Sequence, residues 1–356
     1  MPADAVTLLD AGGPLLAGDA IVFRVRTAGD ARVVRLCQEL SRPRTGPELT
    51  RSDDVWSLRF PRAEVDRMEY QFQVAGPDGE AVYALDPGNP LRVPGPFGDK
   101  SVLELPGYRP PDWLGGPPVL PDGLPTVPLR TLGTRLEIPV WSPPGIPKRR
   151  RLPLVVAHDG PDYARYGGLL TMLARRIAGG RLPPVRAALL APVDRDEHYS
   201  ASPAYTAALA TEILPALIEA APARPGAVVG LGASLGALAM LCAHRGGAPL
   251  AGLLLQSGSF FTPVTDPQEA GYRRFGRITA FTAELLGGRG PVRPIPVTLT
   301  CGLPEENLAN NRAVATALAG QGYPAELVTG RDAHNWVAWR DLLDPHLTRL
   351  LATAGG

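Results

Sequence analysis

Two kinds of hydrophobic pattern divide the chain into an N-terminal and a C-terminal part. From about residue 19 to 105, short segments alternate apolar and polar positions and are separated by turn residues. Alternation with a period of two, interrupted by regular turns, is typical of a small antiparallel β-sandwich of the immunoglobulin type. We therefore predict a β-sandwich domain over residues 1–105, with strands at 20–26, 32–37, 55–60 and 68–74. The segment 86–101 is too rich in proline and glycine to predict regular structure there.

The second part follows a stretch dense in proline and glycine, residues 106–129, which predicts a semi-rigid linker. From Arg130 onward, continuous apolar strand segments alternate with helical ones. This pattern predicts a mostly parallel sheet with helices on both faces, the α/β-hydrolase fold, over residues 130–356. The expected strands include 136–141, 152–157, 187–193, 252–257, 296–301 and 325–329, and the expected helices include 169–178, 204–220, 308–319 and 335–351.

The segment 228–240 holds the strongest candidate for chemistry. A β-branched apolar run leads into Gly232-Ala233-Ser234-Leu235-Gly236, and an Ala- and Leu-rich helical run follows. A G-x-S-x-G pattern between a strand and a helix predicts a tight turn that projects the serine hydroxyl. The two glycines leave room where a Cβ would collide with a neighbouring strand or helix. We predict that Ser234 is a nucleophile and that the Leu235 N–H, at the helix start, stabilises an oxyanion.

A base is expected after a later strand, because active sites in parallel sheets lie at the carboxyl ends of strands. The chain order in α/β-hydrolases is Ser, acid, His. Among the histidines after Ser234, only His334 follows a predicted strand. His244 lies inside a predicted helix, and His346 is expected to be a surface or capping residue. His334 is therefore the predicted base.

The acid is less well defined by the sequence. Glu305 and Glu306 come just after the strand at 296–301, and Asp266 follows the strand before it. We favour Glu305, with Glu306 as the reserve and Asp266 as a rival. All three stay open, because a carboxylate at a helix start also interacts favourably with the helix dipole.

A second oxyanion donor is expected from the loop 158–163, which follows an earlier strand. Pro161 has no N–H, so Gly160 or Asp162 must supply the donor. His158 precedes the nucleophile in the chain, and we expect it to form part of the pocket wall.

The composition argues against nucleic-acid-binding, membrane-binding and disulfide-rich proteins. Apolar residues make up 45%, charged residues 20%, and the net charge is +1, which argues against nucleic acid or an anionic membrane as partner. Three cysteines are too few and too scattered for a disulfide framework. No metal or cofactor is predicted. Residues 1–5 lack the basic start of a targeting signal, and no apolar run has membrane-spanning length. We expect a cytoplasmic enzyme that acts on a small-molecule ester.

Several segments follow one another in the order of a known family. They are 86–90, 95–98 and 101–107, then His158-Asp159-Gly160, Gly232–Gly236, Gln256–Phe260 and 302–311, and finally His334-Asn335-Trp336 with Trp339-Arg340. Together they resemble the enterochelin (enterobactin) esterases, within the esterase-D-like branch of α/β-hydrolases. The resemblance spans nearly the whole chain, and its most specific parts are the two-domain combination and the histidine motif.

The resemblance implies hydrolysis of the ester bonds of a tri-catecholate trilactone siderophore, often ferric, with release of iron in the cytosol. It also implies that Ser234 and His334 are catalytic residues and that the acid of the triad varies among relatives. A ferric tris-catecholate is a bulky trianion, so we expect guanidinium groups to bind it. The candidates are Arg195, Arg273, Arg274, Arg277, Arg331 and Arg340. The alternatives are an esterase or acyltransferase for another ester or depsipeptide, and a siderophore-binding protein with an inactive site.

Overall fold

The computed structural model describes residues 6–40 and 46–354. Residues 1–5, to which the prediction about a targeting signal refers, lie outside the described residues. The chain divides into two compact units. Unit 1 comprises Met1–Arg109, Leu303–Glu306 and Arg331–Asn335, and unit 2 comprises Pro110–Gly302, Asn307–Gly330 and Trp336–Gly356.

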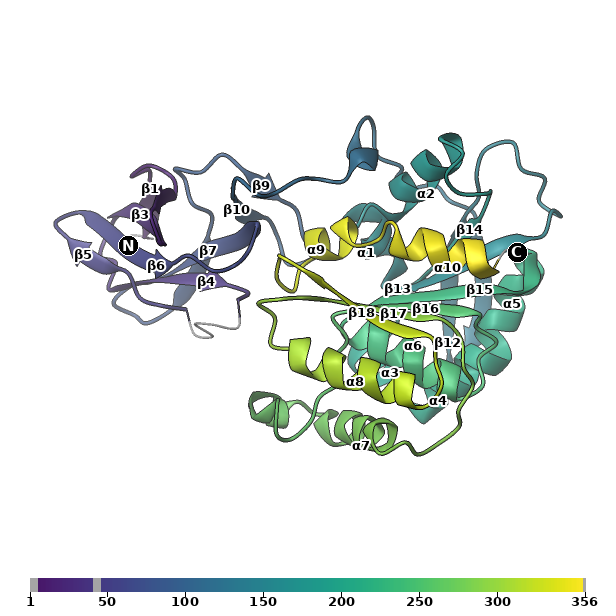
Figure 1. Ribbon diagram of the computed structural model, residues 1–356. Coiled ribbons are helices and arrows are strands. Elements are labelled where there is room, and N and C mark those ends of the chain that lie inside the picture. Colours follow the sequence, from purple (N-terminus) through teal and green to yellow (C-terminus); the bar gives the residue numbers. More distant parts are fainter. Residues whose placement is uncertain (1–5, 41–45, 355–356) are drawn as a thin grey trace. The chain divides into compact units, whose positions relative to one another are not determined.

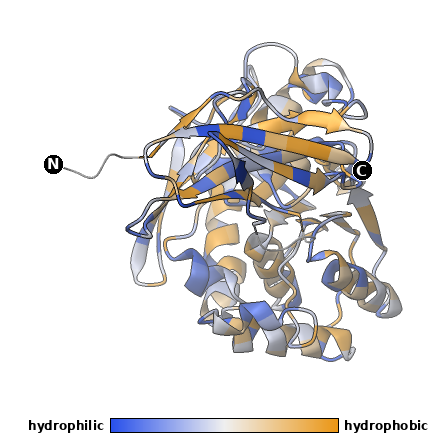
Figure 2. Ribbon diagram, turned by 90° about the vertical axis from the view of Figure 1, so that its left-hand side faces the viewer, coloured by the Kyte–Doolittle hydropathy of each residue, from blue (hydrophilic) through white to orange (hydrophobic). Residues whose placement is uncertain are grey.

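Unit 1 is built from two antiparallel sheets. One has the order β1-β3-β6-β5 with β2 beside β3, and the other has the order β4-β7-β10-β9 with β8 beside β7. The strands are β1 (Thr7–Leu9), β2 (Leu15–Ala17), β3 (Ala20–Ala28), β4 (Val33–Gln38), β5 (Thr50–Ser52), β6 (Val55–Pro61), β7 (Arg67–Ala75), β8 (Ala81–Ala84), β9 (Arg92–Val93) and β10 (Lys100–Glu104). Figure 2 shows the apolar positions that run along the strands.

The two sheets of unit 1 share one hydrophobic core. Ile21, Phe23 and Val25 alternate along β3 and are fully buried, as a strand with one buried face requires. Phe23 lies edge-on against Tyr70 of β7, with 4.9 Å between the ring centroids. The predicted antiparallel pattern is therefore observed. The segment 86–101 differs from its prediction, because β9 lies in it and β10 begins in it, and β10 pairs with β7.

Unit 2 is built on one eight-stranded sheet with the order β11-β12-β14-β13-β15-β16-β17-β18. β11 and β12 are antiparallel to their neighbours, and the six strands from β14 to β18 in that order run parallel. The strands are β11 (Thr126–Thr131), β12 (Thr134–Trp141), β13 (Leu152–His158), β14 (Arg186–Leu190), β15 (Ala223–Ala233), β16 (Gly252–Gln256), β17 (Val297–Gly302) and β18 (Ala325–Gly330).

Helices cover both faces of this sheet, as the continuous apolar strands predict (Figure 1). They are η1 (Asp112–Leu114), α1 (Gly160–Arg165), α2 (Leu169–Ala178), α3 (Arg195–Tyr199), α4 (Pro203–Ala208), η2 (Leu209–Ile213), α5 (Leu214–Ala220), α6 (Leu235–Arg245), η3 (Pro267–Gly271), α7 (Phe275–Leu286), α8 (Leu308–Gly320), α9 (Trp336–Asp341) and α10 (His346–Ala354). Along β13, Val155 and Ala157 join the core under α1, α2 and α10, while Leu154 and Val156 join the core under α4 to α8.

Two parts of unit 2 differ from the sequence-based expectation. β11 begins at Thr126, inside the segment expected to be a linker, and Trp113 of the same segment is buried in the core under α2. The helix expected over 335–351 is two helices, α9 and α10, which are separated at Pro345. Proline has no N–H to donate and disfavours helical geometry in the residue before it, so one continuous helix cannot form there.

Candidate active site

Ser234 occupies the single position between β15 and α6. Its φ is 55° and its ψ is −124°, a region that L-amino acids rarely adopt. Its N–H donates to the carbonyl of Gln256 at 2.9 Å, which ties the turn to the end of the neighbouring strand β16. This strained strand-to-helix turn has the geometry that the G-x-S-x-G pattern predicts.

Gly232 and Gly236 permit the turn because the backbone approaches closely at both positions. A Cβ on Gly232 would lie 2.4 Å from the carbonyl oxygen of Gly236, and a Cβ on Gly236 would lie 3.2 Å from the Cβ of His158. The first distance is shorter than any van der Waals contact allows. The glycines therefore have the role that the sequence predicts, and Gly232 is the more demanding of the two.

The first turn of α6 lies beside the loop that follows β13. The Oδ2 atom of Asp159 would be 3.4 Å from a Cβ on Gly236. Asp159 has a left-handed φ of 50°, and α1 begins at Gly160, where a Cβ would lie 2.3 Å from the Cα of Leu189. Leu235 and Gly160 are each the first residue of a helix, so their N–H groups have no acceptor within that helix. The two expected oxyanion donors thus begin neighbouring helices at one edge of the sheet.

Ser259 lies against the candidate nucleophile. The Oγ atoms of Ser234 and Ser259 are 3.0 Å apart, and the Ser259 N–H donates to the Ser234 carbonyl at 3.2 Å. The adjacent Gly258 is held by Asn311, which accepts from its N–H at 3.0 Å and donates to its carbonyl at 2.9 Å. Ser259 was not among the residues predicted to act, although it follows the end of β16, where polar residues are favoured for catalysis.

His334 and Glu305 form a hydrogen bond within unit 1. The His334 Nδ1 lies 2.8 Å from Glu305 Oε2, and the carboxyl group of Glu305 is almost completely buried. Burial lowers the pKa of His334, but the hydrogen bond and the charge of Glu305 raise it by more, so the pKa lies above its ordinary value of 6.5. A carboxylate only accepts hydrogen bonds, so Nδ1 carries the proton and Nε2 is the basic nitrogen of the neutral ring.

His158 is buried and hydrogen-bonded through both ring nitrogens. Its Nδ1 lies 2.9 Å from the carbonyl oxygen of Gly236, and its Nε2 lies 2.9 Å from the hydroxyl of Tyr205. Burial lowers its pKa to about 4, so the ring is neutral near pH 7. Its contacts join β13 to α4 and α6.

The two other histidines that follow Ser234 have partners away from it. The His244 Nε2 lies 2.7 Å from the carbonyl oxygen of Arg293. His346 was expected at the surface or at a cap. It is buried at the first residue of α10, with its Nδ1 2.8 Å from a guanidinium nitrogen of Arg349.

The alternative acids have other surroundings. The carboxylate of Asp266 is fully buried and accepts hydrogen bonds from the Asn310 amide at 2.8 and 3.0 Å and from the Thr262 N–H at 2.8 Å. Glu306 is exposed, and its charge contributes less to the pKa of His334 than that of Glu305. Among the three candidates, Glu305 is the one whose hydrogen bond to His334 is observed.

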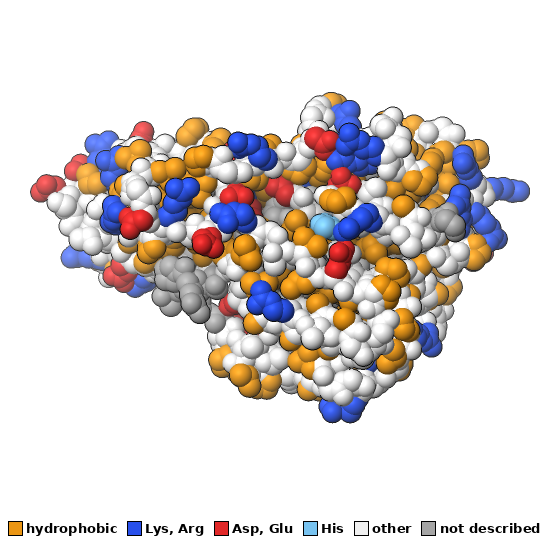
Figure 3. Space-filling view, viewed as in Figure 1, with side chains coloured by type: hydrophobic (Ala, Val, Ile, Leu, Met, Phe, Trp, Pro, Cys, Tyr) orange, Lys and Arg blue, Asp and Glu red, His pale blue; other side chains and the backbone are white. Residues whose placement is uncertain are grey.

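Most of the arginines expected to bind an anionic substrate already face a carboxylate. The pairs are Arg195 with Asp159, Arg274 and Arg277 with Glu197, Arg331 with Asp66, and Arg340 with Asp341. Arg273 is exposed, and no ion pair joins it to a residue in 6–40 or 46–354. Figure 3 shows positive and negative side chains interspersed over the visible face. An anionic substrate would therefore compete with protein carboxylates for most of these guanidinium groups.

The structure thus brings together Ser234 with Ser259 in unit 2 and His334 with Glu305 in unit 1. The pairing of Ser234 with His334 stays a prediction. Within the described residues, no group of three or more His, Cys, Asp or Glu side chains is arranged to hold a metal ion. None of the described helices is both long and apolar enough to span a membrane.

Solved structures match nearly the whole chain. Ferric enterobactin esterase from Salmonella typhimurium matches with a TM-score of 0.73 and 20% identity, over 96% of each chain. Enterobactin esterase from Shigella flexneri, solved in the presence of 2,3-dihydroxy-N-benzoyl-serine, matches with a TM-score of 0.71 and 20% identity, also over 96% of each chain. This chain has the fold of the enterobactin esterases.

The resemblance seen in the sequence is therefore confirmed at the level of the fold, including its mixed sheet with helices on both faces. The immunoglobulin type of the N-terminal sheets stays a prediction. A ferulic acid esterase matches with a TM-score of 0.50 and 17% identity, over 63% of this chain and 97% of that chain. No family model matches the sequence, and no curated protein matches it either.

The close approach at the turn predicts that Gly232→Ala destabilises the fold by about 1–3 kcal/mol, because the new methyl group must displace backbone rather than a flexible side chain. Gly276→Ala is the matched control. Gly276 lies in α7, and a Cβ there would meet nothing within 4 Å. The free energy of unfolding of Gly276→Ala should therefore be unchanged or slightly higher than that of the native protein. Denaturant unfolding of both variants measures the difference. Equal free energies of unfolding would contradict the close approach.

The raised pKa of His334 predicts a pH effect of Glu305→Gln. A base must be neutral to accept a proton, so removal of the carboxylate should lower the pKa of His334 and move the acidic limb of kcat/KM to lower pH. The plateau rate should nevertheless fall by about 10³- to 10⁴-fold, because the imidazolium and its tautomer lose their partner. Glu306→Gln is the control and should move the limb only slightly. An unchanged limb and plateau in Glu305→Gln would exclude Glu305 as the acid.

Proposed function

We propose that this protein is a serine esterase that hydrolyses the ester bonds of a catecholate-type siderophore such as a ferric trilactone. The observation that carries the proposal is the strained turn at Ser234, placed between a parallel strand and a helix. Such a turn costs conformational energy that a purely structural serine would not require. It presents a hydroxyl at the carboxyl edge of the sheet, where substrates bind in this class of fold.

In the proposed reaction, the Ser234 Oγ attacks the ester carbonyl carbon while the His334 Nε2 takes the hydroxyl proton. Glu305 accepts the Nδ1 proton in a hydrogen bond of 2.8 Å, which orients the ring and stabilises the imidazolium. The N–H of Leu235 and a donor at Gly160 or Asp162 hold the oxyanion of the tetrahedral intermediate. The C–O bond then breaks, and His334 returns the proton to the leaving alkoxide.

The acyl-enzyme is hydrolysed by the same groups. His334 removes a proton from water, the hydroxide adds to the acyl carbon, and the Ser234 Oγ leaves with the proton from His334. In a trilactone, the first such cycle opens the ring, and each later cycle shortens the linear product by one ester. Loss of the ring weakens the hold of the three catecholates on iron, which the enzyme would release in the cytosol.

Chain connectivity supports the meeting of Ser234 and His334. The sheet order places β18 three strands from β15, which corresponds to about 14 Å at the usual strand spacing. His334 is four residues beyond the end of β18 at Gly330, and four residues can span roughly 13 Å. The length of the chain therefore allows the imidazole to reach back to the serine, and the two side chains add further reach.

The pairing of the candidate arginines with carboxylates favours a second candidate substrate, an aromatic ester that carries less charge than a ferric trilactone. Five of the six arginines expected to bind a trianion face carboxylates. The phenols of a metal-free catecholate keep their protons near pH 7, as a tyrosine does, and a feruloyl ester carries no charge at its ester group. Either would bind without displacing protein carboxylates.

The proposed nucleophile predicts that Ser234→Ala removes nearly all turnover and leaves the fold intact, because the variant deletes only the attacking oxygen. Losses of about 10⁶-fold are typical of triad serines. A fluorophosphonate probe should label the native protein on the peptide that contains Ser234 and should not label the variant. Ser57→Ala, in β6 of unit 1, is the control and should label normally. Absence of labelling in the native protein would favour a binding protein with an inactive site.

The substrate class is decided by comparing kcat/KM for a ferric trilactone, the metal-free trilactone and a feruloyl ester, with the products identified by mass. The siderophore proposal expects the trilactones to exceed the feruloyl ester by at least about 10²-fold. Preference for the metal-free over the ferric form would agree with the paired arginines. Preference for the feruloyl ester would replace the siderophore proposal with the second candidate.

A further inference from the structure

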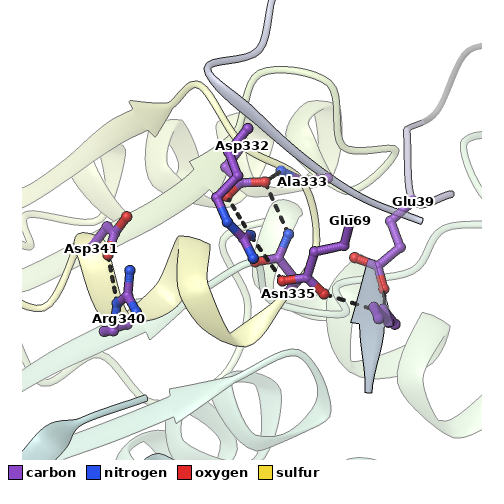
Figure 4. Close-up of polar contacts among 9 residues, drawn as sticks. Glu39, Glu69, Asp332, Ala333, Asn335, Arg340 and Asp341 are labelled. Carbon is purple, nitrogen blue, oxygen red and sulfur yellow. Dashed lines mark hydrogen bonds and ion pairs between the residues drawn. The ribbon is translucent and has the colours of Figure 1, made fainter. Parts of the chain in front are cut away.

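The segment Arg331–Asn335, which carries His334, is organised by the carboxylate of Asp332. The Asp332 Oδ1 accepts the N–H of Ala333 at 2.7 Å and the side-chain amide of Asn335 at 2.9 Å. These are the residues immediately before and after His334. Figure 4 shows Asp332, Ala333 and Asn335 gathered around these contacts. The orientation of the histidine therefore depends on where the Asp332 carboxylate is held.

Two consecutive residues hold this segment within unit 1: Asp66, which precedes β7, and Arg67, which begins it. The N–H of Asp66 donates to the carbonyl of Arg331 at 2.7 Å, and the guanidinium of Arg331 donates to the Asp66 carboxylate at 2.9 Å. The next residue, Arg67, donates to Asp332 Oδ2 at 3.3 Å. Asp66 thus fixes the backbone of the segment, and Arg67 fixes the carboxylate that frames His334.

Arg67 is buried between two carboxylates. Its exposed fraction is 2%, and the same Nη1 that faces Asp332 donates to Glu69 Oε1 at 2.8 Å. Lys100 continues the cluster, with its ammonium 3.6 Å from Glu69 Oε2 and in contact with Glu39. Burial raises the pKa of Asp332 to about 6, and Arg67 opposes that rise. Without the guanidinium, the buried Asp332 would lose the counter-charge that Arg67 supplies, and Glu69 would keep only Lys100.

We propose that Arg67 is a positioning residue for His334. Arg67 acts through Asp332 and does not contact the substrate. The inference rests on the proposed function, because it takes His334 to be the base. It gives the N-terminal β-sheets a part in catalysis, since β7 supplies Arg67. A displacement of about 1 Å at a catalytic group can cost about 10²-fold in rate, so a small shift of Asp332 is sufficient to matter.

Arg67→Lys tests the inference because it keeps the buried positive charge and removes the planar guanidinium that reaches both carboxylates. We expect kcat to fall by about 10²-fold with little change in KM. The matched control is Arg59→Lys, since Arg59 on β6 forms an exposed ion pair with Asp19 in the same unit. The control should keep the native kcat. Thermal unfolding of both variants checks that the fold is retained.

Asp332→Asn is a second variant, which tests the inference even if Arg67→Lys does not fold. Asparagine keeps an acceptor for Ala333 and Asn335 but can turn a donor toward Arg67. It should reduce kcat as Arg67→Lys does. The imidazole resonances of His334 give a readout that a loss of global stability does not move. In both variants, the pKa of His334 should shift toward its ordinary value as the ring loses its fixed position beside Glu305.

A double-mutant cycle with His334→Ala separates this inference from the proposed function. Turnover at the native rate in His334→Ala would overturn the proposed function itself. If His334→Ala keeps only a small residual kcat, adding Arg67→Lys to it should lower kcat no further. A full additional loss there would overturn the inference and leave the esterase proposal intact. So would a folded Arg67→Lys or Asp332→Asn protein with the native kcat and the native pKa of His334.

Discussion

The backbone at Ser234 is the constraint on which the rest of the candidate site depends. A positive φ at a non-glycine residue is stable only when its surroundings enforce it. Here the enforcement comes from the Ser234 N–H bond to the end of β16 and from the absence of side chains at Gly232 and Gly236. The parallel sheet supplies the hydrogen bond, because it aligns the ends of neighbouring strands at one edge, and the sequence supplies the two glycines. The strain at one residue is thus supported by a sheet of eight strands.

The surroundings of His334 are organised by charge rather than by strand geometry. Glu305 faces the imidazole, while Asp332 frames the residues on either side and is itself held by Arg67. Buried ion pairs add little net stability, because desolvation offsets their attraction. Their effect is to restrict the arrangements that a segment can take. For the base proposed at His334, such restriction matters more than added stability.

The arginines at the carboxyl edge of unit 2 are also paired with carboxylates. Arg195 donates to both carboxylate oxygens of Asp159, and Arg274 and Arg277 share Glu197. These contacts fix the loops that follow β13 and β14 and the start of α7. They also leave little uncompensated positive charge for an anionic ligand. The arginines therefore have a clear structural role, whatever part they take in binding.

The sequence by itself determined the two-part organisation, the order of most strands and helices, and the candidates Ser234 and His334. Those features depend on local periodicity and on polar residues at strand ends, which are visible along the chain. Only the tertiary structure decided which carboxylate faces His334 and which carboxylates face the arginines. It alone showed that Ser259 contacts Ser234 and that Arg67 holds Asp332 beside the segment of His334. Arg67 and Asp332 are 265 residues apart. A pairing of this kind is specified by the packing of whole elements, and no local pattern records it.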